Sequence, residues 1–398
     1  MVRPGILLVG NHPPPYGGVP THIEYLSRHL APRWRVHVLS FARPNVPARA
    51  TEGYRVHRPR LARWAGLPLP VGRVRSKASF ASFRAAAPRE YFTTLAIAKQ
   101  IVRLVRRHRI SILSVYHLLP SGLAAAWACE HLGLPLITTV FGEIYAAPDA
   151  HEARRAEIQY VLDSSRRMLS CSRHCAASLE SWTHRTPPAV VYYGVDLERF
   201  SPRVEGSGIR DRLGIRPEQP MALFVGRLVR EMGLETVLEA IRPVASTHPD
   251  VVFVIVGASG QMLAEARRVQ HERPRTVRLL PDAPAGDLPA IYAAADVVLA
   301  PSINQRACLG LALLEAMASA KPVVGCAVGG TPEVVSDATG ILVPPEHPRE
   351  LAAATAGLIS APARRRAMGL AGRRAAEERF DFRSTCAQME SIFREALT

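Results

Sequence analysis

Glycine and arginine residues stand directly after apolar, β-branched runs, at positions where strands would end. Gly226-Arg227 follows one such run, and Gly257 begins a glycine-containing segment after the next. In parallel α/β sheets ligands bind beyond the carboxyl ends of the strands, where a missing Cβ lets them approach the backbone. The forked guanidinium of Arg227 suits a diphosphate, because it donates two parallel hydrogen bonds. The pattern predicts an anion site, although an isolated arginine is more often a surface residue.

Glu315 is a second candidate for chemistry. Gly310 opens a predicted helix, Leu311–Ala318, in which Glu315 is the single charged residue. A lone carboxylate in a buried helix needs a partner, and a ligand hydroxyl would serve. Gly329-Gly330 leads into another predicted helix, and Gly17-Gly18 lies between the first strand and the first helix. A glycine pair of this kind suits a ligand loop or a structural turn about equally well.

These loops require strands that end at a common sheet edge. Short β-branched runs alternate with segments of helical period almost throughout, which is the pattern of parallel α/β layers. In the first half, strands are predicted at Ile6–Val9, Arg35–Ser40, Ile112–Tyr116, Leu136–Val140, Met168–Cys171 and Val190–Tyr193. In the second half, they are predicted at Ala222–Val225, Val251–Val256, Val277–Leu280, Val297–Ala300, Pro322–Gly325 and Gly340–Val343. The fold class is therefore α/β, with two doubly wound parallel-sheet domains in series.

Two further segments complete the predicted organisation. The polar segment Ser201–Pro220, punctuated by glycine and proline, marks the domain boundary. The tail Leu351–Thr398 is predicted to be mostly helical.

Residues 42–110 interrupt the alternation. A proline-rich stretch leads into a segment with twelve arginines between Arg55 and Arg109 and few acids. This segment is a candidate acceptor-side insert, or a peripheral contact with an anionic membrane surface. A solvated helical hairpin would explain the same composition.

The composition limits the function classes. The 398 residues carry a net charge of +16, with 47 arginines and 3 lysines. That bias is typical of a GC-rich genome, and the chain has neither paired zinc-binding cysteines nor a basic-aromatic RNA-binding signature, so we expect no nucleic-acid partner. Six scattered cysteines indicate reduced thiols, and no apolar run is long enough to span a membrane. We expect a cytoplasmic protein, with the inner membrane face as a peripheral alternative.

Taken together, these motifs resemble those of glycosyltransferase family 4, a family of retaining enzymes. The resemblance implies the GT-B fold, in which two Rossmann-like domains face a central cleft. The resemblance runs nearly end to end. The matching segments are Gly17-Gly18, Gly194–Pro202, Gly226–Gly233, Leu288–Ser302, Leu313–Ala318 and Lys321–Val334. It implies an acceptor-side domain over 1–200, a nucleotide-sugar domain over 201–381, and a helix over 382–398 that packs back on the first domain.

The resemblance also implies roles for individual residues. Glu315 would hold the ribose hydroxyls and Arg227 the diphosphate, while Gly310 and Leu311 would offer backbone N–H groups to the phosphates. Gly17 and Gly18 would let the first loop approach the donor phosphates and the acceptor. Backbone groups around Asp282 would read the base. Gly226 and Gly257 line the same donor site.

Two positions in the donor half depart from the family pattern. Met232 stands where the family usually has a lysine beside the diphosphate, and Arg230 is the candidate stand-in. Ala307 replaces a glutamate that contacts the donor sugar in the family. The surrounding loop is two residues longer, which makes Gln305 or Asn304 the candidate replacement.

A third departure lies in the acceptor half. Phe141 replaces a histidine that commonly ends a first-domain strand, and Glu143 is the nearest polar group. Arg227, Arg230 and Glu143 are thus the candidate catalytic residues, and neither a metal nor a cofactor is expected.

The leading functional hypothesis is retaining transfer from a nucleoside-diphosphate sugar, with UDP favoured, to a natural product or aminocyclitol as in antibiotic biosynthesis. Alternatives are a cell-envelope glycolipid acceptor and a degenerate, non-catalytic partner protein. An epimerase would need further acid and base residues, and a dehydrogenase lacks its glycine fingerprint. The sequence leaves the donor sugar, the acceptor and the oligomeric state open.

Overall fold

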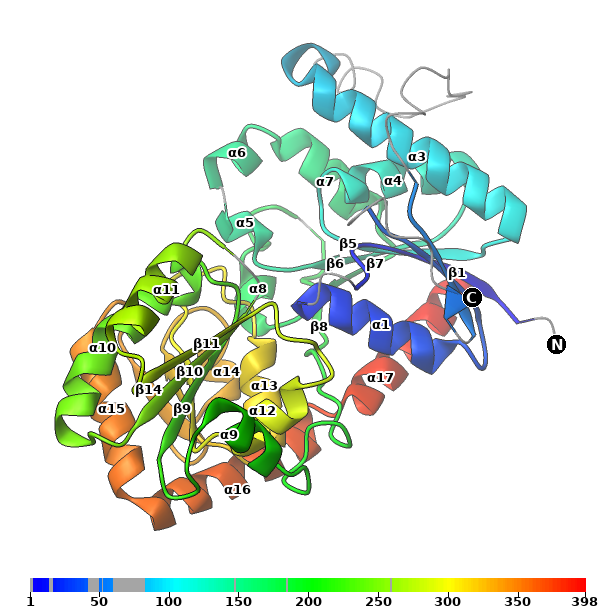
Figure 1. The fold of residues 1–398 in the computed structure, drawn as a ribbon. Helices are drawn as coiled ribbons and strands as arrows, with labels where there is room; N and C mark the ends of the chain where they lie inside the picture. Colours follow the sequence, from blue (N-terminus) through cyan, green and yellow to red (C-terminus); the bar gives the residue numbers. More distant parts are fainter. Residues whose placement is uncertain are drawn as a thin grey trace. The chain divides into compact units, whose positions relative to one another are not determined.

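A computed structural model describes residues 3–13, 17–41, 50–51, 53–59, 83–146, 148–183, 185–257 and 260–398. The chain divides into two units, each with its own sheet (Figure 1). The N-terminal unit comprises residues 1–192 and 383–398, and the C-terminal unit comprises residues 193–382.

The N-terminal unit is built on a sheet whose described strands lie in the order β3-β4-β2-β1-β5-β6-β7-β8. All neighbours run parallel except β3 and β4. Every residue of β1 and β5 is buried, as expected where helices cover both faces of a parallel sheet. The strands are β1 (Gly5–Val9), β2 (Arg35–Leu39), β3 (Ala50–Thr51), β4 (Tyr54–His57), β5 (Ile112–Tyr116), β6 (Leu136–Val140), β7 (Arg167–Ser170) and β8 (Ala189–Val190).

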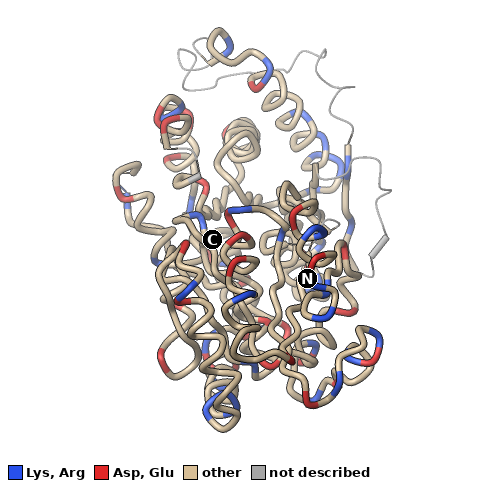
Figure 2. The backbone as a smooth tube through the Cα atoms, turned by 60° about the vertical axis from the view of Figure 1, so that its left-hand side comes forward, with Lys and Arg blue, Asp and Glu red and all other residues tan. Residues whose placement is uncertain are grey.

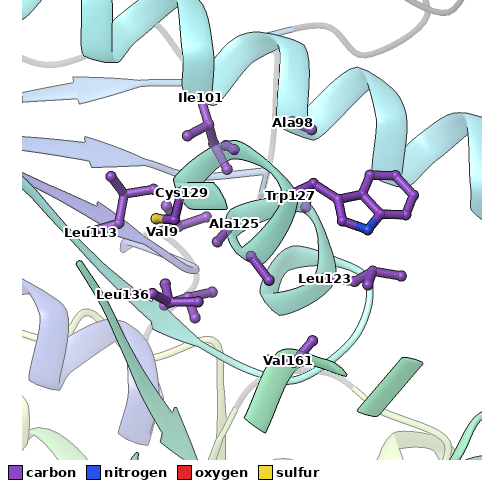
Figure 3. Packing of buried hydrophobic residues seen from close by; sticks show 14 of the residues in the cluster. Val9, Ala98, Ile101, Leu113, Leu123, Ala125, Trp127, Cys129, Leu136 and Val161 are labelled. Carbon is purple, nitrogen blue, oxygen red and sulfur yellow. The ribbon is translucent and has the colours of Figure 1, made fainter. Parts of the chain in front are cut away.

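Helix α4 (Ser121–Leu132) forms the centre of one core of this unit, between the sheet and α3 (Pro88–His108). In Figure 3, Val9, Leu113 and Leu136 extend from the strands beside α4, and Ala98 and Ile101 lie on α3 above it. The remaining helices are α1 (Gly18–Leu30), α5 (Glu143–Ala146), α6 (Pro148–Glu152), α7 (Arg155–Ser164), α8 (Arg173–Ala177) and α17 (Phe382–Leu397).

The structure corrects the interpretation of residues 42–110 as a solvated hairpin, as far as it describes them. Strand β4 pairs with β2, and α3 buries its apolar face while Arg103, Arg106 and Arg107 stay exposed. The error arose because the short β4 carries only one aliphatic residue, Val56. Residues 42–49, 52 and 60–82 lie outside the described part, so the membrane contact predicted for 55–109 stays a prediction.

The C-terminal unit has a six-stranded sheet in the order β11-β10-β9-β12-β13-β14, and all paired neighbours are parallel. The strands are β9 (Met221–Val225), β10 (Val252–Gly257), β11 (Val277–Pro281), β12 (Val297–Ala300), β13 (Val323–Cys326) and β14 (Gly340–Val343). Each lies within about two residues of its predicted place. The prediction of two parallel α/β sheets is therefore confirmed.

Helices cover this second sheet. Helix α10 (Leu234–Thr247) buries Leu234, Val237 and Ile241 in the core. The others are α9 (Ser207–Leu213), η2 (Arg230–Met232), α11 (Leu263–Glu272), α12 (Leu288–Ala294), α13 (Leu311–Ala318), α14 (Thr331–Val334), α15 (Pro348–Ser360) and α16 (Pro362–Arg379). The tail is helical, as predicted.

Helix α17 is attached to the N-terminal unit by hydrogen bonds to one buried carboxylate, that of Glu390. Glu390 accepts hydrogen bonds from Trp34 Nε1 at 3.0 Å and from Arg33 Nε at 3.0 Å. The ring of Phe393 meets Trp34 edge-on, with centroids 6.3 Å apart. A helix at the end of the sequence thus completes the first unit.

Charge, cysteines and hydropathy agree with the sequence-based expectations. Figure 2 shows lysine and arginine scattered along the tube with acidic residues between them. All six cysteines are free. None of the described helices is both long and apolar enough to cross a membrane.

Candidate functional site

The loops after β9 and β10 approach each other closely at the carboxyl edge of the C-terminal sheet. Gly226 N–H donates to Val256 O at 3.0 Å, and Asp282 N–H donates to Gly257 O at 2.9 Å. A Cβ on Gly257 would lie 1.6 Å from Gly226 O, so no larger residue fits there. The glycines let the backbones of two adjacent strand ends approach each other closely.

Arg227 and Arg230 lie in the same loop but have different partners. Both are exposed. Arg230 Nε lies 2.9 Å from Glu235 Oε2, and its Nη2 lies 3.7 Å from Glu346 Oε1. Arg227 makes no ion pair or side-chain hydrogen bond with any described residue. Its guanidinium is therefore the one in this loop that is available to an anion.

Met232 occupies an apolar position. Its Cε would lie 3.3 Å from a Cβ on Gly226, and its side chain packs against the core. The next residue, Gly233, has φ 75°, and a Cβ there would lie 1.7 Å from Pro301 O. The loop is thus pressed against the segment that follows β12.

That segment, residues 301–310, links the surrounding loops. Asn304 Oδ1 accepts the N–H of Arg306 at 3.0 Å, so its side chain closes a local turn. Gln305 Oε1 accepts the N–H of Gly329 at 3.3 Å, and Ala307 O accepts the N–H of Gly330 at 2.7 Å. The structure brings Gln305, but not the side chain of Asn304, to the glycine pair after β13.

Helix α13 begins directly after this segment. Gly310 has φ 82°, a conformation that favours glycine, and its carbonyl accepts the N–H of Leu313 at 3.0 Å. The N–H groups of the first helical residues, beginning with Leu311, have no acceptor within the helix, and the helix dipole favours an anion at this end. The helix start lies where the sequence placed it, and phosphate binding at Gly310 and Leu311 stays a prediction.

Glu315 lies on the same helix with 7% of its surface exposed. Burial raises its pKa to about 7, while the nearby Tyr292 hydroxyl and the charge of Arg199 act in the opposite direction. The Tyr292 hydroxyl lies close enough to interact with the carboxyl but forms no hydrogen bond of good geometry. The Glu315 carboxyl was expected to need a ligand hydroxyl as its partner. Tyr292 and Arg199 of the protein supply part of that interaction.

In the N-terminal unit, the loop after β1 leads to Gly17, whose carbonyl accepts the N–H of Thr21 at 2.9 Å, and to Gly18 at the start of α1. Arg58 Nη2 donates to His12 O at 3.0 Å and to Pro13 O at 2.6 Å, which sets a positive charge beside this loop. Residues 14–16 lie outside the described part.

Glu143 braces two adjacent strand ends. Its Oε1 accepts the N–H of Leu118 at 2.8 Å, its Oε2 accepts the N–H of Phe141 at 3.1 Å, and His117 Nδ1 lies 3.5 Å from Oε2. Burial opposes ionisation, but His117 and the two N–H groups outweigh it and lower the pKa of Glu143. A carboxylate with both oxygens occupied is suited to holding the loops, and its catalytic role stays a prediction.

We expect Glu143→Gln to lower stability rather than to remove chemistry. The amide would set an NH2 group against a backbone N–H, at a cost of about 1–3 kcal/mol. The low pKa also means that the stability contributed by Glu143 is present above its unfolded pKa and is lost as pH falls through the folded value. Urea unfolding at pH 7 measures the first effect. A large fall in turnover with unchanged unfolding would instead favour catalysis.

Sequence reasoning missed three residues of these sites. His117 follows β5 as Glu143 follows β6, so its position after a predicted strand could have identified it as a site residue. Its backbone φ of 136° could not have been predicted from the sequence. Arg199 and Tyr292 approach Glu315 from segments 116 and 23 residues away in the sequence, and their proximity follows only from the fold.

Both halves of the chain match known glycosyltransferase families. Residues 207–375 match the family described as "Glycosyl transferases group 1", and residues 16–199 match "Glycosyltransferase Family 4". A D-inositol 3-phosphate glycosyltransferase from Segniliparus rotundus is 34% identical over 285 residues, covering 67% of this chain and 62% of that protein. The chain thus spans less than two thirds of that relative's length.

Two further relatives and one solved structure are similar. The D-inositol 3-phosphate glycosyltransferase of Saccharomonospora viridis is 32% identical over 70% of this chain and 68% of its own. A GDP-mannose-dependent monoacylated α-(1-6)-phosphatidylinositol monomannoside mannosyltransferase of Corynebacterium glutamicum is 33% identical over 45% and 49%. Sucrose-phosphate synthase from Thermosynechococcus elongatus superimposes with a TM-score of 0.77 at 22% identity over 99% of both chains, which confirms the GT-B fold.

Proposed function

The chain belongs to glycosyltransferase family 4, and from this premise we propose that it transfers a sugar from a nucleoside-diphosphate donor to an acceptor hydroxyl, with retention of the anomeric configuration. The observation that carries the proposal is local to the C-terminal unit. Three groups follow strands of one sheet edge: the N-terminus of α13, the buried Glu315, and Arg227, whose side chain has no partner among the described residues. The positive charge of Arg227 and the N–H groups at the start of α13 suit a diphosphate, and the carboxyl of Glu315 suits the hydroxyls of a ribose.

The protein groups would act through electrostatics and positioning. Negative charge grows on the leaving diphosphate in the transition state, and Arg227 with the N–H groups after Gly310 would stabilise that charge. The diphosphate oxygen can then accept the proton of the incoming hydroxyl on the same face of the sugar. The acceptor hydroxyl gains most from being held on that same face of the sugar, beside the departing diphosphate.

For the acceptor, we propose a hydroxyl of a phosphorylated inositol or of an inositol-containing glycolipid. The names of the relatives support this class, and the charge of Arg58 beside the loop after β1 suits a phosphate. The same relatives favour the cell-envelope alternative over the natural-product or aminocyclitol acceptor, and antibiotic biosynthesis has no support among them. UDP-sugars remain the first donors to test, followed by GDP-mannose.

The test is a matrix of donors and acceptors with mass-spectrometric detection. UDP- and GDP-sugars are each combined with an inositol phosphate, with phosphatidylinositol in vesicles, and with an aminocyclitol. We expect one donor to give a glycosylated inositol product, and Arg227→Ala to slow its formation by about 10²–10³-fold. Product formation only on the aminocyclitol would refute the acceptor class.

A non-catalytic partner protein is the second candidate, because Met232 and Ala307 remove a charge and a sugar contact from the donor site. It predicts neither transfer nor slow hydrolysis with any donor, while the nucleotide still binds. The same matrix therefore separates the two functions.

A further inference from the structure

Three histidines of the N-terminal unit converge from three separate elements. His37 lies in the middle of β2, His57 ends β4, and His108 ends α3. One ring nitrogen from each lies within 4.8 Å of the other two. None of these residues takes part in the proposed transfer reaction.

The rings contact one another rather than other polar groups. His37 Nδ1 and His57 Nε2 are 2.9 Å apart, and the two ring planes differ by 7°. The ring of His108 stacks on His37, with centroids 4.2 Å apart and planes 28° apart. In the described part of the chain, the hydrogen bonds of these three rings involve only each other. Each neutral imidazole carries one N–H and one nitrogen lone pair, so the cluster contains three lone pairs, one of which accepts the hydrogen bond between His37 and His57.

The imidazoles are neutral near pH 7, which is the form that binds metals. Burial, followed by the charges of neighbouring histidines and arginines, lowers the pKa of His37 to about 3 and that of His57 to about 4. Burial also lowers the pKa of His108. A metal ion would compete with few protons for these nitrogens.

We propose that His37, His57 and His108 form a binding site for one transition-metal dication of the zinc type. Zinc binds histidine nitrogens at about 2.0–2.1 Å, which separates tetrahedral ligands by about 3.4 Å. The ligand atoms already lie within 4.8 Å of one another, and metal binding requires the stacked His108 ring to turn away from His37 so that the ring nitrogens converge on one point. Three imidazoles leave one position for water.

The bound ion would tie β4 and α3 to β2, and thus fasten one side of the first sheet. Arg35, Arg55 and Arg107 lie near the cluster and oppose a dication, although Arg35 also donates to Arg3 O and Arg109 O. These charges favour moderate rather than tight binding. The site goes beyond glycosyl transfer, because it contains no residue of the donor loops or of the loop after β1.

The test uses the full-length, untagged chain stripped of metal with a chelator. Co²⁺ titration should give visible absorption bands that saturate at one ion per chain, and Zn²⁺ should displace Co²⁺ because it binds such sites more tightly. Added Zn²⁺ should also raise Tm in a concentration-dependent way. Absence of saturation at one ion per chain would overturn the proposal.

Two variants and one control locate the ion. His108→Gln and His57→Gln should each weaken Co²⁺ binding at least about tenfold, since each removes one of three ligands. His271→Gln, at an exposed residue that like His108 lies in the last turn of a helix, should leave binding unchanged. Melting in chelator identifies the variants that fold as the parent does. Undiminished binding by either folded cluster variant would place the ion elsewhere and refute the site.

Discussion

Replacing Arg227 by alanine is expected to lower kcat/KM by about 10²–10³-fold, the effect of removing one preorganised donor from a site of growing negative charge. Arg227 has no protein partner in the described part of the chain, so its loss leaves no buried group unsatisfied. We therefore expect the melting temperature to stay within about one or two degrees of the parent's. Steady-state kinetics with the cognate donor measure the first effect and calorimetry the second.

Arg230→Ala is the matched control, because the same loop carries a second exposed arginine that is already paired with Glu235 and Glu346. We expect a change of no more than a few fold. If Arg230→Ala equals Arg227→Ala in effect, then Arg230 leaves its glutamates when the donor binds and replaces the family lysine. Met232→Lys is the complementary test. A clear gain in turnover would show that the diphosphate site around Arg227 lacks one positive charge.

Glu315→Gln is expected to weaken nucleotide binding by about 10- to 100-fold, because hydrogen bonds to a charged group contribute about 1.5–3 kcal/mol. The ribose hydroxyls would donate to the ionised carboxylate and thus lower its pKa from about 7. Binding near pH 6.5 should then release a fraction of a proton, and the glutamine variant should release none. Titration calorimetry in two buffers of different ionisation enthalpy measures this release.

The pH dependence of stability provides an independent check on Glu315. Its folded pKa is raised, so the native state binds more protons than the unfolded state between about pH 4.5 and 7. The contribution of this group to stability is therefore present at low pH and is lost as pH rises through about 7. Glu315→Gln should be at least as stable as the parent at pH 8. A large loss of stability with unchanged nucleotide affinity would assign Glu315 a structural role only.

Much of the donor half was predictable because its signals are local. The strand ends at Val225, Gly257 and Ala300 follow from apolar runs, and the glycines after them mark close backbone contacts. The order of the strands makes these ends neighbours, as parallel doubly wound sheets require. The local signals of the sequence are therefore enough to predict that Gly226, Gly257 and Gly310 lie at one edge of the sheet.

Side-chain pairing was not predictable, because it depends on packing between distant segments. Nothing near Glu315 in the sequence indicates Arg199 or Tyr292, and nothing near Arg230 indicates Glu346. Strand β4 was missed because its four residues, of which only Val56 is aliphatic, are a weak signal beside the two-residue edge strand β3. His57 of the histidine cluster lies on that same strand, so a sequence analysis that misses β4 also misses the cluster.

The central claim, that Arg227 and the start of α13 hold a diphosphate, is tested most directly by comparing nucleoside diphosphate with the matching monophosphate in titration calorimetry. The parent protein should bind the diphosphate at least about tenfold more tightly, since each charge-assisted contact contributes about 1.5–3 kcal/mol. Arg227→Ala should remove most of that preference while keeping the affinity for the monophosphate. Equal affinity of the parent for both nucleotides, or an equal loss of both in Arg227→Ala, would contradict the account.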